Sequence, residues 1–200
     1  MSGPVTIASI VEGHGEMTAV PELLRRIAYA SGIWEVRVPE PQRVPRGSMI
    51  APGGIEAAVR KSAALHITGP GGILVLIDAD KDCPAALGPA LLSRAREARG
   101  DKEIAVVIAH KEFEAWFLAA AKSLSGRRGL IDPLEPPPDP EGIRDAKGWL
   151  TAHKIDGTSY KETADQAALA ALFDLEQARG GAPSFDKFCR DVERLLRGGS

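Results

Sequence analysis

Acidic residues follow two apolar runs of the sequence, Val5–Val11 and Ile73–Ile77. These acids are Glu12, Asp78, Asp80 and Asp82. In an open parallel sheet, ligands bind beyond the carboxyl ends of the strands, so residues at two such ends lie close together. Carboxylates placed together repel each other unless a cation or a proton intervenes. The pattern therefore predicts a divalent-metal site of the kind that performs phosphoryl-transfer chemistry.

The expected ion is Mg²⁺ or Mn²⁺, because Mg²⁺ usually takes one or two protein carboxylates and keeps waters and substrate phosphates as its other ligands. Glu12, Asp78 and Asp80 are the expected catalytic residues. The same three residues, together with Glu16 and Asp82, are the expected metal ligands. Glu16 lies four residues after Glu12, so it could reach the site from the first turn of a helix.

Three of these acids also have a structural explanation. A negative charge in a first helical turn suits the helix dipole, which would account for Glu16 without any ligand. Asp78 could simply be solvated at the edge of the sheet. Asp82 stands before Cys83 and Pro84, where it could cap the next helix.

Two further segments could contribute to the same site. His110 to Trp116 follows a third apolar run, so Glu114 could complete a metal shell and Lys111 could face a phosphate. Alternatively, the aromatic residues of this segment form the core face of a helix whose acids suit its dipole. His14, between two glycines, could touch a substrate, although a lone histidine in a loop is usually just solvated.

Other catalytic signatures are missing. The sequence has no GxxxxGK[ST] phosphate-binding loop and no GxSxG nucleophile elbow. Five arginines could contact a phosphate backbone, although scattered arginines usually form a solvated face. They are Arg94, Arg96, Arg99, Arg127 and Arg128.

Strands that alternate with helices must position these residues. Continuous apolar runs predict buried parallel strands over Val5–Val11, Ile73–Ile77 and Ile104–Ala109, and a weaker strand over Trp34–Val38. Helices are expected after a cap at Thr18, then over Ile55–Ile67, Ala85–Arg99, Glu112–Lys122, Ile143–Leu150, Lys161–Arg179 and Ser184–Arg197. The order predicts an α/β fold, Rossmann-like, with a mostly parallel sheet covered on both faces by helices. We expect an α/β domain over residues 1–124, a proline-rich linker over 125–140, and a helical appendage over 141–200 that packs on the domain.

Composition narrows the class of protein. The formal charge of −2 gives no global basic field, so nucleic-acid binding would need a local patch or a partner. The two cysteines form no CxxC pair, which argues against a zinc ribbon or a disulfide framework. The start of the chain lacks the pattern of a secretory signal, and no apolar run approaches the roughly 20 residues that span a bilayer. We expect a cytoplasmic protein that does not insert into a membrane.

The order of motifs resembles the Toprim domain of topoisomerases, primases and OLD-type nucleases. The resemblance rests on Val11 to Glu16 after the first strand and on Ile77-Asp78-Ala79-Asp80 after a later one. The sequence resembles more closely a bacterial domain-of-unknown-function family classed as Toprim-like. Its matching segments are Glu112 to Ala115, Ser159 to Thr163 and Ser184 to Phe188.

The resemblance implies acid–base chemistry or metal binding at Glu12, Mg²⁺ binding at Asp78 and Asp80, and a second metal at Glu16 and Asp82. The expected activity is hydrolysis of phosphodiester bonds in DNA or RNA, and the expected setting is a defence or mobile-element system with an ATPase partner. Two alternatives stay open. One is an inactive Toprim-like interaction module, and the other takes Asp78-Ala79-Asp80 as the DxD of a glycosyltransferase or phosphatase.

Overall fold

The computed structural model describes residues 3–155 and 157–198, and in them one parallel sheet carries the fold. Its strand order is β2-β1-β4-β5, with β3 also paired to β1. The strands are β1 (Val5–Val11), β2 (Val36–Arg37), β3 (Gln42–Arg43), β4 (Gly71–Asp78) and β5 (Glu103–Ala109). All of the pairings between these five strands are parallel. The predicted α/β class with a parallel sheet is confirmed.

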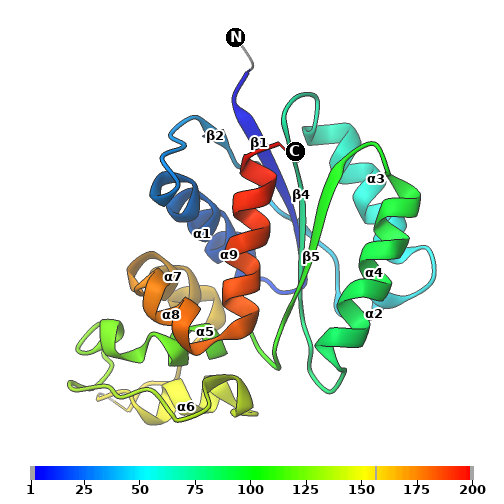
Figure 1. The fold of residues 1–200 in the computed structure, drawn as a ribbon. Helices are drawn as coiled ribbons and strands as arrows, with labels where there is room; N and C mark the ends of the chain where they lie inside the picture. The colour runs from blue at the N-terminus through cyan, green and yellow to red at the C-terminus, as the bar shows by residue number, and fades with distance from the viewer. Residues whose placement is uncertain (1–2, 156, 199–200) are drawn as a thin grey trace.

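Alternate residues of the central strands face two different layers of helices. On β4, Leu74 and Leu76 belong to one hydrophobic cluster, whereas Ile73, Val75 and Ile77 belong to the other. This alternation is the period of two that a strand imposes, and it explains why β4 is apolar at every position. One face is covered by α1 (Glu16–Ala30) and α9 (Pro183–Leu196), and the other by α3 (Gly54–His66) and α4 (Pro84–Ala98) (Figure 1).

The remaining helices are short. They are α2 (Arg46–Ile50), α5 (Ala115–Ala119), α6 (Ala146–Ala152), α7 (Ala167–Leu172) and α8 (Leu175–Gly181). Helices α5 to α8 gather at the end of the molecule where β5 finishes, at the lower left of Figure 1. They therefore lie beside the edge of the sheet at which the sequence predicts chemistry.

Several predicted helix boundaries are wrong, and local capping explains two of them. Lys161–Arg179 is divided into a π-helical turn at Glu162–Gln166, then α7 and α8. The chain leaves the helix there because the Asp174 side chain caps α8, accepting from the backbone N–H of Gln177 at 2.8 Å. Asp145 likewise caps α6 by accepting from the N–H of Gly148 at 2.7 Å, so this helix begins three residues later than expected.

Two other predicted helices also differ. Glu112–Lys122 is only α5, followed by a 3-10 turn at Ala121–Leu124. Helix α1 begins at Glu16, so Thr18 lies inside it and is not its N-cap. The Thr18 hydroxyl instead donates to the carbonyl of Gly15 at 3.0 Å.

The C-terminal segment shares its core with the first 124 residues. One hydrophobic cluster joins Leu23 of α1 and Leu74 of β4 to Phe185 and Phe188 of α9. Within the proline-rich stretch expected to be a linker, Leu130 and Leu134 are each 1% exposed and belong to the same cluster. The division into domain, linker and appendage remains an interpretation of the sequence, and the structure packs all three parts around common side chains.

Among the described residues, no helix combines the length and the apolar character needed to cross a membrane.

Candidate active site at the carboxyl edge of the sheet

The loop after β1 is organised by a carboxylate. Glu16 is 6% exposed in the first turn of α1, and its Oε2 accepts from the N–H of Glu12 at 3.0 Å and of Gly13 at 2.8 Å. These two hydrogen bonds connect the first turn of α1 to the backbone of the loop after β1. Glu12 is only partly buried, and its Oε2 accepts from the N–H of Asp78 at 3.3 Å. The ends of β1 and β4 are joined at this point, as the sequence predicts for parallel neighbours.

Asp78 connects the end of β4 to the segment after β5. Its Oδ1 accepts from the N–H of Phe113 at 2.9 Å, which places the carboxylate next to Glu114. Glu114 is 1% exposed, and its Oε1 accepts from the hydroxyl of Tyr160 at 2.9 Å and from the amide of Gln166 at 3.2 Å. The other oxygen, Oε2, is buried and has no hydrogen-bond partner among the described residues. A buried carboxylate oxygen that accepts no hydrogen bond is costly, so it marks a position where a cation or proton would be stabilised.

A lysine from the C-terminal segment faces the acids. The Nζ of Lys147, at the start of α6, lies 4.0 Å from Glu114 Oε2 and forms an ion pair with Glu162. Glu162 opens the π-helical turn that ends at Gln166, so this turn brings two polar side chains to the site. Single-turn π-bulges are frequent at functional sites. Gly15 permits the approach of the turn, because a Cβ at position 15 would lie 2.0 Å from Gln166 Oε1.

Burial raises the pKa values of Glu12, Glu16, Asp78 and Glu114, and neighbouring acidic side chains raise them further. Burial, and then the charges of Glu16, Glu114 and Glu12, hold the pKa of Asp78 well above its usual range. Burial likewise raises the pKa of Glu114 to about 7, and it raises the pKa values of Glu12 and Glu16. We call Glu12, Glu16, Asp78 and Glu114 the acidic cluster. At neutral pH, the cluster therefore gains from binding a cation or retaining protons.

Lys147 is the main basic partner of the cluster. Burial lowers its pKa, but Glu114 and Glu162 act in the opposite direction and carry the pKa above the usual range for lysine. Its charge also lowers the pKa of Asp78, Glu12 and Glu114. Lys147 is therefore charged at neutral pH and offsets only part of the negative charge of four carboxylates.

Asp80 and Asp82 belong to a different arrangement. Arg46 donates from Nε to Asp80 Oδ2 at 3.0 Å and from Nη2 to Asp82 Oδ2 at 2.5 Å, and both aspartates are exposed. Asp80 still lies close enough to raise the pKa of Glu12. The alternative in which Asp82 caps α4 is wrong, because no side chain caps that helix. Asp78 and Asp80 have different partners, so nothing in this geometry favours the DxD alternative.

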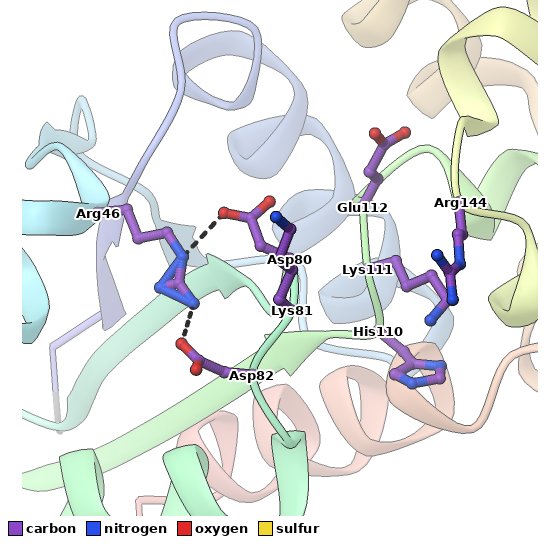
Figure 2. A pocket seen from close by; sticks show the side chains of 8 residues that line it. All are labelled: Arg46, Asp80, Lys81, Asp82, His110, Lys111, Glu112 and Arg144. Atoms are coloured by element: carbon purple, nitrogen blue, oxygen red, sulfur yellow. Dashed lines mark hydrogen bonds and ion pairs between the residues drawn. The ribbon is translucent and has the colours of Figure 1, made fainter.

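A cavity of about 770 Å³ opens beside the cluster. It is lined by Arg46, Asp80, Lys81, Asp82, His110, Lys111, Glu112 and Arg144. Figure 2 shows Arg46 with its two aspartates on one side and Lys111 and Arg144 on the other. Lys111 is thus near the acids, as the sequence analysis expects. His14 is exposed and is not one of the lining residues.

Some residues of the site have no sequence signal. Arg46, Lys147 and Arg144 come from segments without a recognisable motif, so only the fold brings them to this edge. Tyr160 and Glu162 do lie in a segment that carries the family resemblance. Three of the five arginines proposed for phosphate contact have other partners, since Arg94 pairs with Glu56, Arg99 with Asp101 and Arg128 with Asp165.

The donor chemistry of the cluster fits a hard divalent cation, but a full ligand set is not preformed. Within residues 3–155 and 157–198, no three His, Cys, Asp or Glu side chains are grouped as ready metal ligands. A closed structural site is therefore not indicated. A Mg²⁺ ion held by one or two carboxylates and completed by waters remains compatible, and the orphaned Glu114 oxygen is consistent with it.

Comparison with known proteins gives a family. The sequence model described as "Domain of unknown function (DUF4276)" matches residues 11–193. The chain belongs to this family. No curated protein and no solved structure matches the sequence. Because the match runs from the end of β1 to α9, both the acidic cluster and Lys147 lie inside the DUF4276 region.

Proposed function

We propose that this DUF4276 protein is a metal-dependent hydrolase of phosphodiester bonds, and that the acidic cluster is its active site. The observation that carries the proposal is the convergence of four carboxylates from three segments of the chain: the loop after β1 with the start of α1, the end of β4, and the turn before α5. Three of these carboxylates raise the pKa of the fourth, Asp78. Such strongly perturbed groups concentrate at functional sites. The adjacent cavity, with its lysines and arginines, supplies room for a phosphate-bearing substrate.

In this proposal Glu12 and Asp78 would hold a Mg²⁺ or Mn²⁺ ion, and Glu16 would fix the loop that carries Glu12. A bound divalent ion would supply positive charge to the reacting phosphate. Glu114, with a pKa of about 7, can accept or release a proton near neutral pH. Tyr160 and Gln166 orient Glu114 by hydrogen bonds to Oε1. Lys147 limits the repulsion among the acids.

The resemblance to Toprim nucleases supports the same reaction class and makes DNA or RNA the substrate to test. The resemblance also motivates a search for an ATPase partner in a defence or mobile-element system. We propose Glu12 and Asp78 as the main metal ligands in preference to Asp80 and Asp82, because Arg46 already pairs with both of these aspartates.

The experiment is incubation of the pure protein with single-stranded and duplex DNA and RNA in Mg²⁺ or Mn²⁺. We expect cleavage that is abolished by EDTA and reduced at least about 100-fold in Glu12→Gln and Asp78→Asn, as is typical when transition-state charge stabilisation is lost. Glu35→Gln is the matched control. Glu35 is an exposed acid that precedes the amino end of β2, whereas the acidic cluster lies at the carboxyl ends of the strands. Equal cleavage by all four proteins would refute the proposal.

One observation favours a second candidate, a non-enzymatic interaction module. The absence of a ready three-ligand set within the described residues is what such a module would show. Calorimetry separates the two: Mn²⁺ binding that is lost in Asp78→Asn supports the hydrolase, whereas no binding together with a stable co-purified partner supports the module.

A further inference from the structure

Three basic side chains of the cavity have no partner in the described part of the chain. Lys81 and Arg144 are exposed and Lys111 is partly buried, and none of them forms a hydrogen bond or ion pair through its side chain there. Most other lysines and arginines near the sheet edge are already engaged. Arg46 is held by Asp80 and Asp82, and Lys147 by Glu162.

These three cations come from separate parts of the fold. Lys81 follows β4, Lys111 follows β5, and Arg144 precedes α6. Lys111 adopts a φ of 64° and Asp80 a φ of 51°, and the N–H of Asp80 donates to the carbonyl of Lys111 at 3.2 Å. Left-handed conformations at non-glycine residues are unfavourable and concentrate at functional sites. This hydrogen bond joins the segment after β4 to the segment after β5 at the point where Lys81 and Lys111 line the cavity.

The number of unpaired cations limits the ligand. A protein that grips a long duplex uses a stripe of basic residues and makes many phosphate contacts. Here the formal charge of the whole chain is −2, and the cavity also contains three acids. Its volume of about 770 Å³ is the size of a pocket for a small ligand.

We propose that this cavity binds a short single-stranded segment of nucleic acid through two or three consecutive phosphates, held by Lys81, Lys111 and Arg144. The proposal rests on the proposed function and specifies its substrate class. Arg144 can hold a phosphate with two parallel N–H bonds, and each lysine acts as a point charge. The segment would lie beside the acidic cluster, because Asp80 and Arg46 of the cavity both act electrostatically on Glu12.

The test measures binding without hydrolysis, in EDTA, by fluorescence anisotropy of a labelled oligothymidylate of about eight nucleotides and of a labelled duplex. Three phosphate contacts on a single strand predict a slope of about −2 for log K against log salt, so affinity should fall about 15-fold between about 50 and 200 mM salt. Lys111→Gln and Arg144→Gln should each reduce this loss to about sevenfold and weaken binding. Lys61→Gln and Arg60→Gln remove matched charges from α3, outside the cavity, and should match the wild type.

Three results would overturn the inference: no salt-dependent binding, equal effects in the control variants, or tighter duplex binding with a far steeper slope. Failure of the proposed function looks different. Binding with the expected slope but no cleavage in Mn²⁺ would refute only the hydrolase, and cleavage without cavity-dependent binding would refute only this inference. Glu12→Gln should bind the single strand at least as tightly as the wild type does, because the three cations are unchanged and one neighbouring negative charge is removed.

Discussion

At the scale of single residues, Glu114 shows most directly how burial raises the pKa of a carboxyl group. Tyr160 and Gln166 donate hydrogen bonds to its Oε1, whereas its Oε2 has no hydrogen-bond partner in the described residues. Its pKa of about 7 lies above the usual value of 4.5, chiefly because burial disfavours the charged form. The folded protein therefore binds the Glu114 proton more tightly than the unfolded chain does.

This shift makes stability depend on pH. Below about pH 4.5 Glu114 is protonated in both states, so its favourable contribution is complete, and it is lost as pH rises through 7. In EDTA we expect this one group to lower the free energy of unfolding by up to about 3 kcal/mol over that range. Urea unfolding at about pH 5 and pH 7.5 should show a smaller decline for Glu114→Gln than for the wild type. An identical decline in both proteins would show that Glu114 does not titrate in this range.

Gly15 tests the contact between the first helix and the π-helical turn. An alanine Cβ would lie 2.0 Å from Gln166 Oε1 and 3.1 Å from the carbonyl of Glu162. Because Gly15 has an ordinary φ of −66°, alanine is excluded there by contact and not by backbone strain. We expect Gly15→Ala to cost about 1–3 kcal/mol in urea unfolding and to lower any metal-dependent activity. Gly47→Ala, where a Cβ meets nothing within 4 Å, is the control and should leave activity unchanged.

At the scale of elements, a substitution in the turn after β5 distinguishes an effect on anion binding from an effect on the free energy of unfolding. Lys111 holds a φ of 64°, which glycine adopts without penalty. Lys111→Gly is expected to keep or raise the free energy of unfolding, by up to about 1 kcal/mol, while weakening anion binding. Lys61→Gly, in the middle of α3, should instead lose about 1 kcal/mol and keep anion binding. A large loss of stability in Lys111→Gly would contradict the assignment of this residue to binding.

The elements also indicate how far the sequence determines the fold. The strands β1, β4 and β5 agree with their predicted spans within two residues at each end, because a continuous apolar run is a strong local signal. The boundaries of α6 and α8 could not be predicted, since Asp145 and Asp174 cap these helices through contacts that compete with helical periodicity. The pairing of Glu12 with Asp78 was predictable from parallel topology, whereas the arrival of Lys147 required tertiary packing.

The anchoring of α9 is a further tertiary feature. Its Ser184 hydroxyl accepts from the indole N–H of Trp116 at 2.8 Å and donates to buried Glu141 at 2.5 Å. Lys187 and Arg194 of the same helix donate to the carbonyls of Val106 and Ile104 on β5. These bonds attach α9 to β5 and hold this helix against its face of the sheet.

At the scale of the whole molecule, one shared core predicts one cooperative unit. Trp116 belongs to the hydrophobic cluster that joins α1, β4 and α9. Trp149 of α6, in the C-terminal segment, packs against this cluster. We expect fluorescence and far-UV circular dichroism to report a single coincident urea transition. Residues 1–124 alone should lack a cooperative transition, since α9 would no longer cover its face of the sheet. Two separated transitions in the full chain would instead support independent domains.

The most direct test of the central claim is a crystal structure of the protein soaked in Mn²⁺, with the ion located by its anomalous signal. The account predicts a Mn²⁺ peak within ligand distance of Glu12 and Asp78, with Glu114 turned toward the ion or its waters. The same crystal of Asp78→Asn should lose the peak. A peak held only by Asp80 and Asp82, or no peak under conditions that support cleavage, would contradict the assignment of the acidic cluster as the metal-dependent active site.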